Sequence, residues 1–265
     1  INKLRQTTGA GMLDCRKALT ESNGDFEAAI DWLRKQGQKV AAKRSDREAK
    51  EGVVIAQTTA DHKSGIVLCI SCETDFVSKN ADFVAFAQSI ADAAIANDVK
   101  TAEELNGVTV NGAKVEELIN DKLAAIGEKI AVSKFERVDA PYVASYIHGA
   151  NRMGVLVSMT KEAAEAGKDV AMQIAAMNPL AVDETSISQE TKDREKAIAI
   201  EMIKAEGKPA EMAEKIADGK MNKFFKDNTL MHQAFVKDNS KSVADYLKSV
   251  DADLKVTDFK RVALG

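Results

Sequence analysis

The sequence predicts an α+β protein in which a small helical bundle precedes a core of helices and sheets. Short helical patterns fill residues 1–37. Paired apolar strand patterns, each pair followed by a helical pattern, lie at 53–96 and again at 143–177. Two long amphipathic helical patterns joined by a short turn fill 186–226. We therefore expect a three-helix bundle, a hairpin-plus-helix core subdomain that occurs twice, and an inserted antiparallel helical hairpin of coiled-coil type.

The N-terminal bundle is expected to contain three short helices. Gly9-Ala10-Gly11 separates the first helical pattern from the second, and Asn23-Gly24 ends the second. Asp25 is suited to cap the third helix, which we expect to end at Gly37. A bundle of this size buries little surface and has no room for a deep pocket. It therefore indicates a binding module rather than an enzyme.

The first core subdomain follows a charged segment in which Lys and Arg are interspersed with Asp and Glu, a pattern typical of a solvated helical linker. Strands are predicted at 53–59 and 65–71, with a polar turn between them. A helix is predicted at 82–96, where Phe and Ile recur at helical spacing. One more amphipathic helix is expected within 98–134.

The strand and helix pattern of this subdomain then returns. Strands are predicted at 143–147 and 154–159, and a helix at 170–177. The second strand of each pair starts alike, with Gly65-Ile-Val-Leu in the first unit and Gly154-Val-Leu-Val in the second. This similarity predicts a duplicated hairpin-plus-helix unit.

The helical hairpin interrupts the second core unit. Its first helix is predicted at 188–206, with one apolar side, and Pro209 suits the start of its second helix. The predicted division of the chain is a bundle at 1–37, a linker at 38–51, core subdomain N at 52–140, core subdomain C at 141–185 and 227–265, and the hairpin at 186–226. The apolar side of the first hairpin helix is predicted to consist of Ala197, Ile198, Met202 and Ala205.

Composition limits the classes of partner. The net charge of −4 argues against a nucleic-acid binder, which needs clustered Lys and Arg to neutralise phosphates. The three cysteines are an odd number, which favours a reducing compartment over a disulfide framework. No apolar run is long enough to span a bilayer. We expect a cytoplasmic protein that binds neither nucleic acid nor membrane.

No set of residues in the sequence forms a recognisable catalytic or metal site. Cys69 and Cys72 lie three apart in a predicted strand, so their thiols point to opposite faces and cannot converge on a metal ion. There is no Gly-rich phosphate loop. His148 follows a strand but has no obvious nucleophile as a partner. We expect no catalytic residues, no metal ligands and no cofactor.

The stretch with the most functional character joins the apolar strand 65–71 to the next helix. Here the order Glu73-Thr-Asp-Phe-Val77 places an aromatic side chain at a strand-to-helix junction. A junction of this kind presents side chains outward on a rigid base, which suits a protruding contact. The alternative is that Thr74 or Asp75 only caps a turn and that Phe76 folds back into the core.

Three motifs together resemble the bacterial elongation factor Ts family, and the resemblance covers essentially the whole chain. They are Thr8-Gly-Ala-Gly-Met-Leu-Asp-Cys15 with Lys17-Ala-Leu, Cys72-Glu-Thr-Asp-Phe-Val77, and Ser145-Tyr-Ile-His-Gly149. The order of the modules and the late helical hairpin agree with this family. The family commonly has a further C-terminal module, and we expect its contact to be lost or to lie beyond Gly265.

The resemblance implies a guanine nucleotide exchange factor that binds GDP-bound and nucleotide-free elongation factor Tu as a 1:1 heterodimer. It implies a ubiquitin-associated-like bundle that docks on the nucleotide-binding domain of the partner, and a Phe that inserts near the partner's Mg²⁺. The implied contact residues are Arg5, Met12 and Leu13 in the bundle, Thr74, Asp75, Phe76 and Val77 at the Mg²⁺-disturbing contact, and His148 and Val236 in the second core subdomain.

Two other functions stay open on the residues. The first is a passive protein that binds a partner without exchanging its nucleotide. Exchange at substoichiometric amounts would separate this alternative from an exchange factor. The second is an enzyme that uses Cys72 or His148. Alkylation of the thiols would inactivate such an enzyme.

Overall fold

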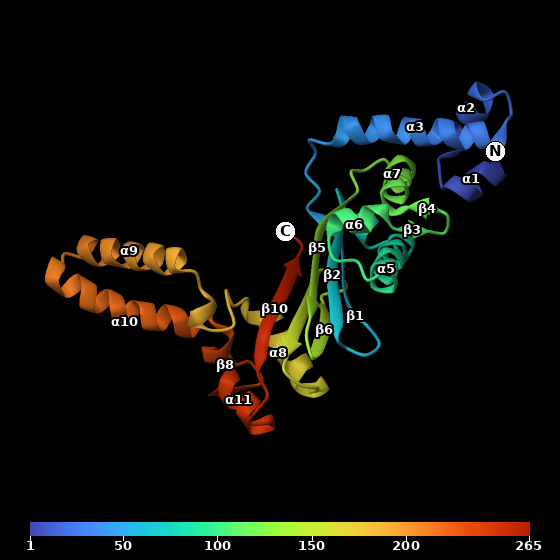
Figure 1. Ribbon diagram of the computed structural model, residues 1–265. Helices are drawn as coiled ribbons and strands as arrows, with labels where there is room; N and C mark the ends of the chain where they lie inside the picture. The colour runs from blue at the N-terminus through green and yellow to red at the C-terminus, as the bar shows by residue number, and fades with distance from the viewer.

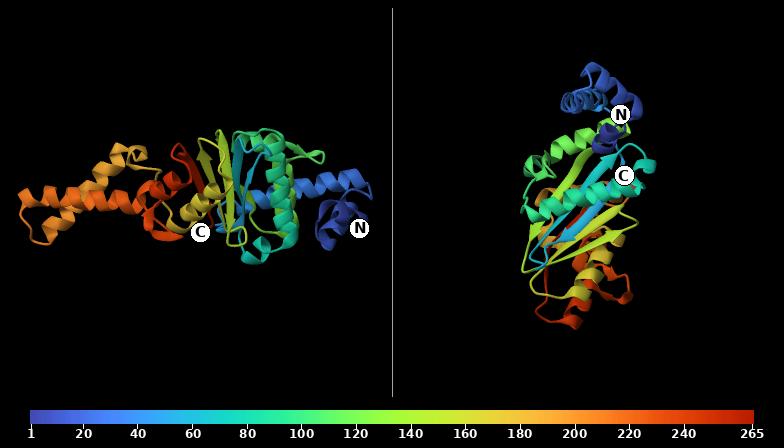
Figure 2. Two further views of the ribbon diagram at one scale, coloured as in Figure 1. Left: turned by 90° about the horizontal axis from the view of Figure 1, so that it is seen from below. Right: turned by 90° about the vertical axis from the view of Figure 1, so that its right-hand side faces the viewer.

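The computed structural model describes residues 1–265 as an elongated molecule (Figures 1 and 2). A helical bundle lies at one end, two packed sheets with their covering helices lie in the middle, and a helical hairpin projects from the other end. No helix is both long enough and apolar enough to cross a membrane.

The N-terminal bundle consists of α1 (Asn2–Thr8), α2 (Met12–Glu21) and α3 (Phe26–Arg44). Asp25 caps α3 as predicted, since its Oδ1 accepts a hydrogen bond of 2.8 Å from the Ala28 N–H. The bundle has its own small apolar core, formed by Leu4, Ala10, Cys15, Ala18, Ala29 and Leu33.

The predicted end of the third helix at Gly37 is wrong, because α3 continues to Arg44. Gly37 is buried where α3 crosses α7 (Val115–Ile126). A Cβ atom at this position would lie 3.0 Å from the Cβ of Ala124 and 3.3 Å from the carbonyl oxygen of Asn120. The glycine therefore permits a close helix crossing instead of ending the helix, and the predicted linker begins inside α3.

Two antiparallel three-stranded sheets form the core. The first has the order β1-β2-β5, and the second has the order β10-β7-β6. In each sheet the second strand of a hairpin is central and pairs with a later strand on its other edge. The strands are β1 (Glu51–Thr58), β2 (Ser64–Cys72), β5 (Ala131–Asp139), β6 (Tyr142–His148), β7 (Met153–Met159) and β10 (Val256–Ala263).

Strand β5 was not predicted. It lies at the edge of its sheet, where Ser133, Lys134 and Glu136 are exposed. An edge strand with polar side chains lacks the apolar alternation from which a buried strand is recognised.

Helices cover the outer face of each sheet (Figure 1). The predicted helix at 170–177 begins earlier, at Ala164, and α11 was not predicted. The remaining elements are α5 (Ala81–Ala96), α6 (Ala102–Gly107), β3 (Thr109–Val110), β4 (Ala113–Lys114), α8 (Ala164–Met177), a 3₁₀ turn (Glu184–Ser186), a second 3₁₀ turn (Leu230–His232), β8 (Ala234–Phe235), β9 (Asp238–Ser242) and α11 (Val243–Val250).

The inner faces of the two sheets pack against each other. Cys69 belongs to this inter-sheet core, whereas Cys72 belongs to the core between the first sheet and its helices. The prediction that the two thiols point to opposite faces is therefore confirmed. The inter-sheet core consists of Val54, Ala56, Val67, Cys69, Val138, Val143, Leu156 and Val262.

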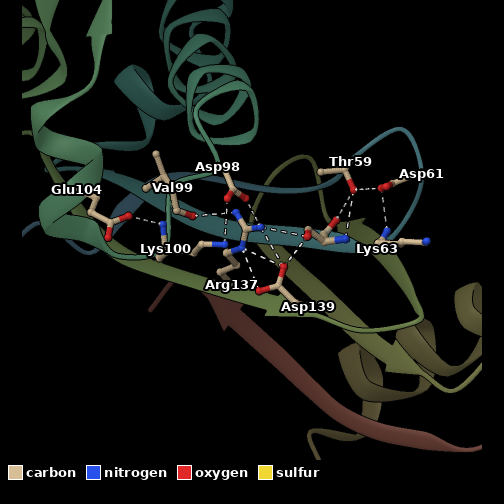
Figure 3. Close-up of polar contacts among 10 residues, drawn as sticks. Thr59, Asp61, Lys63, Asp98, Val99, Lys100, Glu104, Arg137 and Asp139 are labelled. Atoms are coloured by element: carbon tan, nitrogen blue, oxygen red, sulfur yellow. Dashed lines mark hydrogen bonds and ion pairs between the residues drawn. The ribbon is translucent and has the colours of Figure 1, made fainter.

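Arg137 ties the polar edge of the first sheet to the segment that follows α5 (Figure 3). Its guanidinium donates to the carboxylates of Asp98 and Asp139, to the Ser64 hydroxyl and to the Val99 carbonyl. Hydrogen bonding from Arg137 is the main cause that lowers the pKa of Asp139. This network fixes β5 against the rest of the first core subdomain.

The helical hairpin consists of α9 (Gln189–Ala205) and α10 (Ala210–Asn228). Its small core contains Ile203, Ala213 and Ala217. The apolar side predicted for α9 does not form its contact with α10. Ile198 and Met202 are exposed, as are Ala197 and Ala205, because α9 packs on α10 through the adjacent stripe that contains Ile203.

Candidate partner-binding surface

Phe76 lies on a short surface helix directly after the central strand of the first sheet. This helix, α4 (Asp75–Ser78), is a single turn. The Phe76 side chain is 86% exposed, whereas Val77 packs against the core of the first subdomain. The alternative that Phe76 folds back into the core is therefore wrong. An exposed Phe on a well-packed base is free to contact another protein.

Thr74 and Asp75 do not act as simple caps of this turn. Thr74 is the N-cap residue of α4, but its side chain makes no capping hydrogen bond. Its hydroxyl instead donates a bond of 2.6 Å to Oε1 of Glu128. Asp75 accepts a bond of 2.6 Å from the Lys79 ammonium, which lowers the pKa of Asp75. Both side chains support the turn that presents Phe76.

The three bundle residues predicted to contact a partner also lie on the surface. Arg5 is exposed on α1, and Met12 and Leu13 are 49% and 77% exposed at the start of α2. Two neighbouring exposed apolar side chains at the start of a helix form a small patch that is suited to bind another protein.

A groove of about 990 Å³ lies between the bundle and the first core subdomain. Phe76 and Val77 line it from the core, and Thr8 and Trp32 line it from the bundle. Arg5, Met12 and Leu13 do not line this groove. The fold thus brings the Phe76 turn and the bundle to one groove, which the three bundle residues themselves do not line.

His148 and Val236 lie in the second core subdomain. His148 is exposed at the end of β6, where its Nδ1 lies 3.0 Å from the Tyr146 hydroxyl. Val236 is 45% exposed just after β8, and its N–H donates to Oε1 of Gln173 at 2.8 Å. Gln173 is fully buried on α8, so it holds the loop that displays Val236.

Several residues that support the Phe76 turn were not predicted from the sequence. Glu128 contacts Thr74 across 54 residues of chain, and Arg44 contacts Glu73 across 29. No local motif links residues so far apart in sequence. The only signal was the position of Glu73 immediately before the Thr-Asp-Phe-Val segment.

Cys72, the thiol that an enzyme would use, lies inside the fold. No group of three or more His, Cys, Asp and Glu side chains is arranged to hold a metal ion. Cys72 is fully buried, and its Sγ lies 3.3 Å from the Thr74 carbonyl oxygen. Burial, followed by the nearby charges of Glu128 and Glu51, raises the pKa of Cys72 to about 12. A thiol in this environment is protonated at neutral pH and is a poor nucleophile.

We expect the folded protein to resist alkylation at Cys72. The rise of its pKa from 9.0 to about 12 lowers the thiolate population at neutral pH by about a thousandfold. Iodoacetamide treatment followed by mass spectrometry should find Cys72 unmodified in the native protein and modified in urea. Rapid native modification of Cys72 would contradict the buried environment, and a loss of function with it would favour a thiol enzyme.

Comparison with known proteins identifies the family. The family model described as Elongation factor TS matches residues 73–265. A relative named Elongation factor Ts from Christiangramia forsetii is 50% identical, with all of this chain and 97% of the relative covered. Relatives of the same name from Flavobacterium psychrophilum and Clostridium perfringens are 48% and 43% identical, with all of this chain and 97% and 91% of the relatives covered. The chain belongs to the elongation factor Ts family.

Proposed function

We propose that this protein is a guanine nucleotide exchange factor that binds GDP-bound elongation factor Tu and promotes release of GDP, so that GTP can bind. The observation that carries the proposal is the 86% exposed Phe76 on a turn that the core holds from below. Relatives with elongation factor names support a role in translation elongation. The protein acts by binding, and its buried Cys72 takes no part in chemistry.

The mechanism follows from how a GTPase holds its nucleotide. A phosphate-binding loop and a Mg²⁺ ion hold the phosphates, and the Mg²⁺ depends on supporting residues around its ligands. Phe76 inserts beside this site and displaces supporting side chains, without touching the nucleotide. Disturbance of such supporting groups weakens a metal site by roughly 10–100-fold. Thr74, Asp75 and Val77 form the surrounding contact.

The remaining surfaces provide the affinity. Arg5, Met12 and Leu13 contact the nucleotide-binding domain of elongation factor Tu through the bundle, and His148 and Val236 contact another of its domains. An exchange factor lowers nucleotide affinity only by as much as it prefers the nucleotide-free partner over the loaded one. One chain carries all of these contacts, so the complex is a 1:1 heterodimer. It forms in the cytoplasm without direct contact to nucleic acid.

Release of a fluorescent GDP analogue from elongation factor Tu tests this function. We expect a trace amount of this protein to accelerate release from a large excess of loaded partner, since an exchange factor dissociates and acts again. A passive binding protein would form a complex without accelerating release. Acceleration only at stoichiometric amounts would also contradict catalytic exchange.

A further inference from the structure

The turn that carries Phe76 is too short to hold its own position. Helix α4 has four residues, and an isolated helix of that length is unstable in water. Its N-cap residue, Thr74, does not cap it. The exposed Phe76 ring makes few contacts that could fix it. Val77 anchors the turn from below, and the segment that precedes it, Glu73 and Thr74, is its second support.

Glu128 holds this segment with three hydrogen bonds. Its Oε2 accepts from the backbone N–H groups of Glu73 and Thr74, at 3.0 Å each. Its Oε1 accepts from the Thr74 hydroxyl at 2.6 Å. Hydrogen bonds to a carboxylate are stronger than those between neutral groups, and two successive N–H groups form a good anion site. Both oxygens of Glu128 are thus used to fix the base of α4.

The Glu73 side chain in turn accepts a hydrogen bond from Lys129, the residue that follows Glu128. Its Oε1 accepts from the Lys129 N–H at 2.7 Å, and this bond is the main cause that lowers the pKa of Glu73. Arg44 and Arg47 each donate to the same carboxylate at 3.1 Å. We call the carboxylates of Glu73 and Glu128, with the three backbone N–H groups that donate to them, the Glu73–Glu128 clamp. Through Arg44, this clamp also joins the end of α3 to the turn.

We propose that Glu128 is a positioning residue for nucleotide exchange, which acts through the Glu73–Glu128 clamp to hold Phe76 in the geometry that disturbs the partner's Mg²⁺ site. This inference rests on the proposed function. The inserted Phe76 side chain displaces residues of the partner only if the segment that carries α4 is itself held rigidly. Misplacement by about 1 Å can cost as much as 100-fold in rate where geometry decides the step.

Hydrogen exchange in the free protein tests the structural half of the inference without the partner. In Glu128→Gln the amide N–H groups of Glu73 and Thr74 exchange a charged carboxylate acceptor for a neutral amide oxygen, which accepts weaker hydrogen bonds. We expect these two groups, with those of α4, to exchange faster, while amides in β1 and β2 keep their protection. Glu136→Gln is the matched control, because Glu136 is exposed on β5 and its side chain makes no hydrogen bond or ion pair. Faster exchange throughout β2 would show a general loss of stability and would overturn the positioning role.

Release kinetics test the functional half. We expect Glu128→Gln to lower the maximal rate of GDP release by about 10-fold, with little change in the concentration that gives half-maximal rate. A second variant, Thr74→Val, removes only the hydroxyl bond and should show a smaller defect of the same kind. Equal maximal rates for wild type and Glu128→Gln would overturn this inference and leave the exchange function intact. No acceleration by the wild-type protein would instead refute the exchange function itself, whatever the hydrogen-exchange result.

Discussion

Truncation of Phe76 to Ala is expected to lower the maximal rate of GDP release from elongation factor Tu by about 10–100-fold, while the complex still forms. The range is that found when groups supporting a metal site are disturbed, because Phe76 is proposed to act on those groups. The Phe76 side chain is 86% exposed, so its removal leaves the apolar core intact. The free energy of unfolding should therefore change by no more than about 0.5 kcal/mol.

The rate should be measured over a range of concentrations, so that the maximal rate is separated from the concentration at half-maximal rate. Met202→Ala is a suitable control, since Met202 is 57% exposed on the projecting hairpin, outside the proposed contact surface. Phe76→Leu should retain part of the activity because it keeps apolar bulk. The proposed mechanism would be wrong if Phe76→Ala abolished complex formation but left the release rate per complex unchanged.

The Phe76 turn shows how far local sequence can predict a site. The apolar strand before it and the polar break after it predict a strand-to-helix junction, and the structure places α4 there. The clamp that fixes the turn could not be predicted in this way. Glu128 reaches Thr74 only because β5 pairs with β2, and the polar edge strand β5 gave no clear pattern.

The same contrast holds for the fold. Hairpins and amphipathic helices have periodic patterns of their own, and both core hairpins lie where they were predicted. Gly37 was misread because a glycine that ends a helix and a glycine that permits a close helix crossing look alike in sequence. Which of the two it is depends on α7, a distant element. Errors of this kind arise wherever a residue serves a tertiary contact.

Gly65 and Gly154, which begin the similar stretches of the two core units, have a shared structural role. Each lies near the start of a central strand and faces the other sheet. A Cβ atom at Gly65 would lie 2.9 Å from Cγ1 of Val143, and one at Gly154 would lie 2.9 Å from side-chain carbons of Val54 and Val67. The repeat in sequence thus reflects the close approach of the two sheets, which a side chain at either position would prevent.

Gly154→Ala is therefore expected to destabilise the protein by about 1–3 kcal/mol, the usual cost of forcing an extra methyl group into a packed core. The neighbouring side chains, Val54 and Val67, are β-branched and have few rotamers into which they can move, so the sheets must shift instead. Thermal unfolding should show a Tm lowered by roughly 2–12 °C for a chain of this size. Gly219→Ala is the matched control, because nothing lies within 4 Å of a Cβ atom at that helical position. It should stabilise the protein by about 0.4–1 kcal/mol.

Combining Gly154→Ala with Val67→Ala separates steric crowding from other causes. If the added methyl group acts by crowding Val67, the second substitution gives it room. The double variant should then be destabilised by less than the sum of the two single variants. Val67 is fully buried, so its truncation alone costs free energy of unfolding through lost apolar contacts. Additive effects within about 0.3–0.5 kcal/mol would mean that the two positions do not interact. Crowding of Val67 would then not explain why Gly154 is the second residue of its central strand.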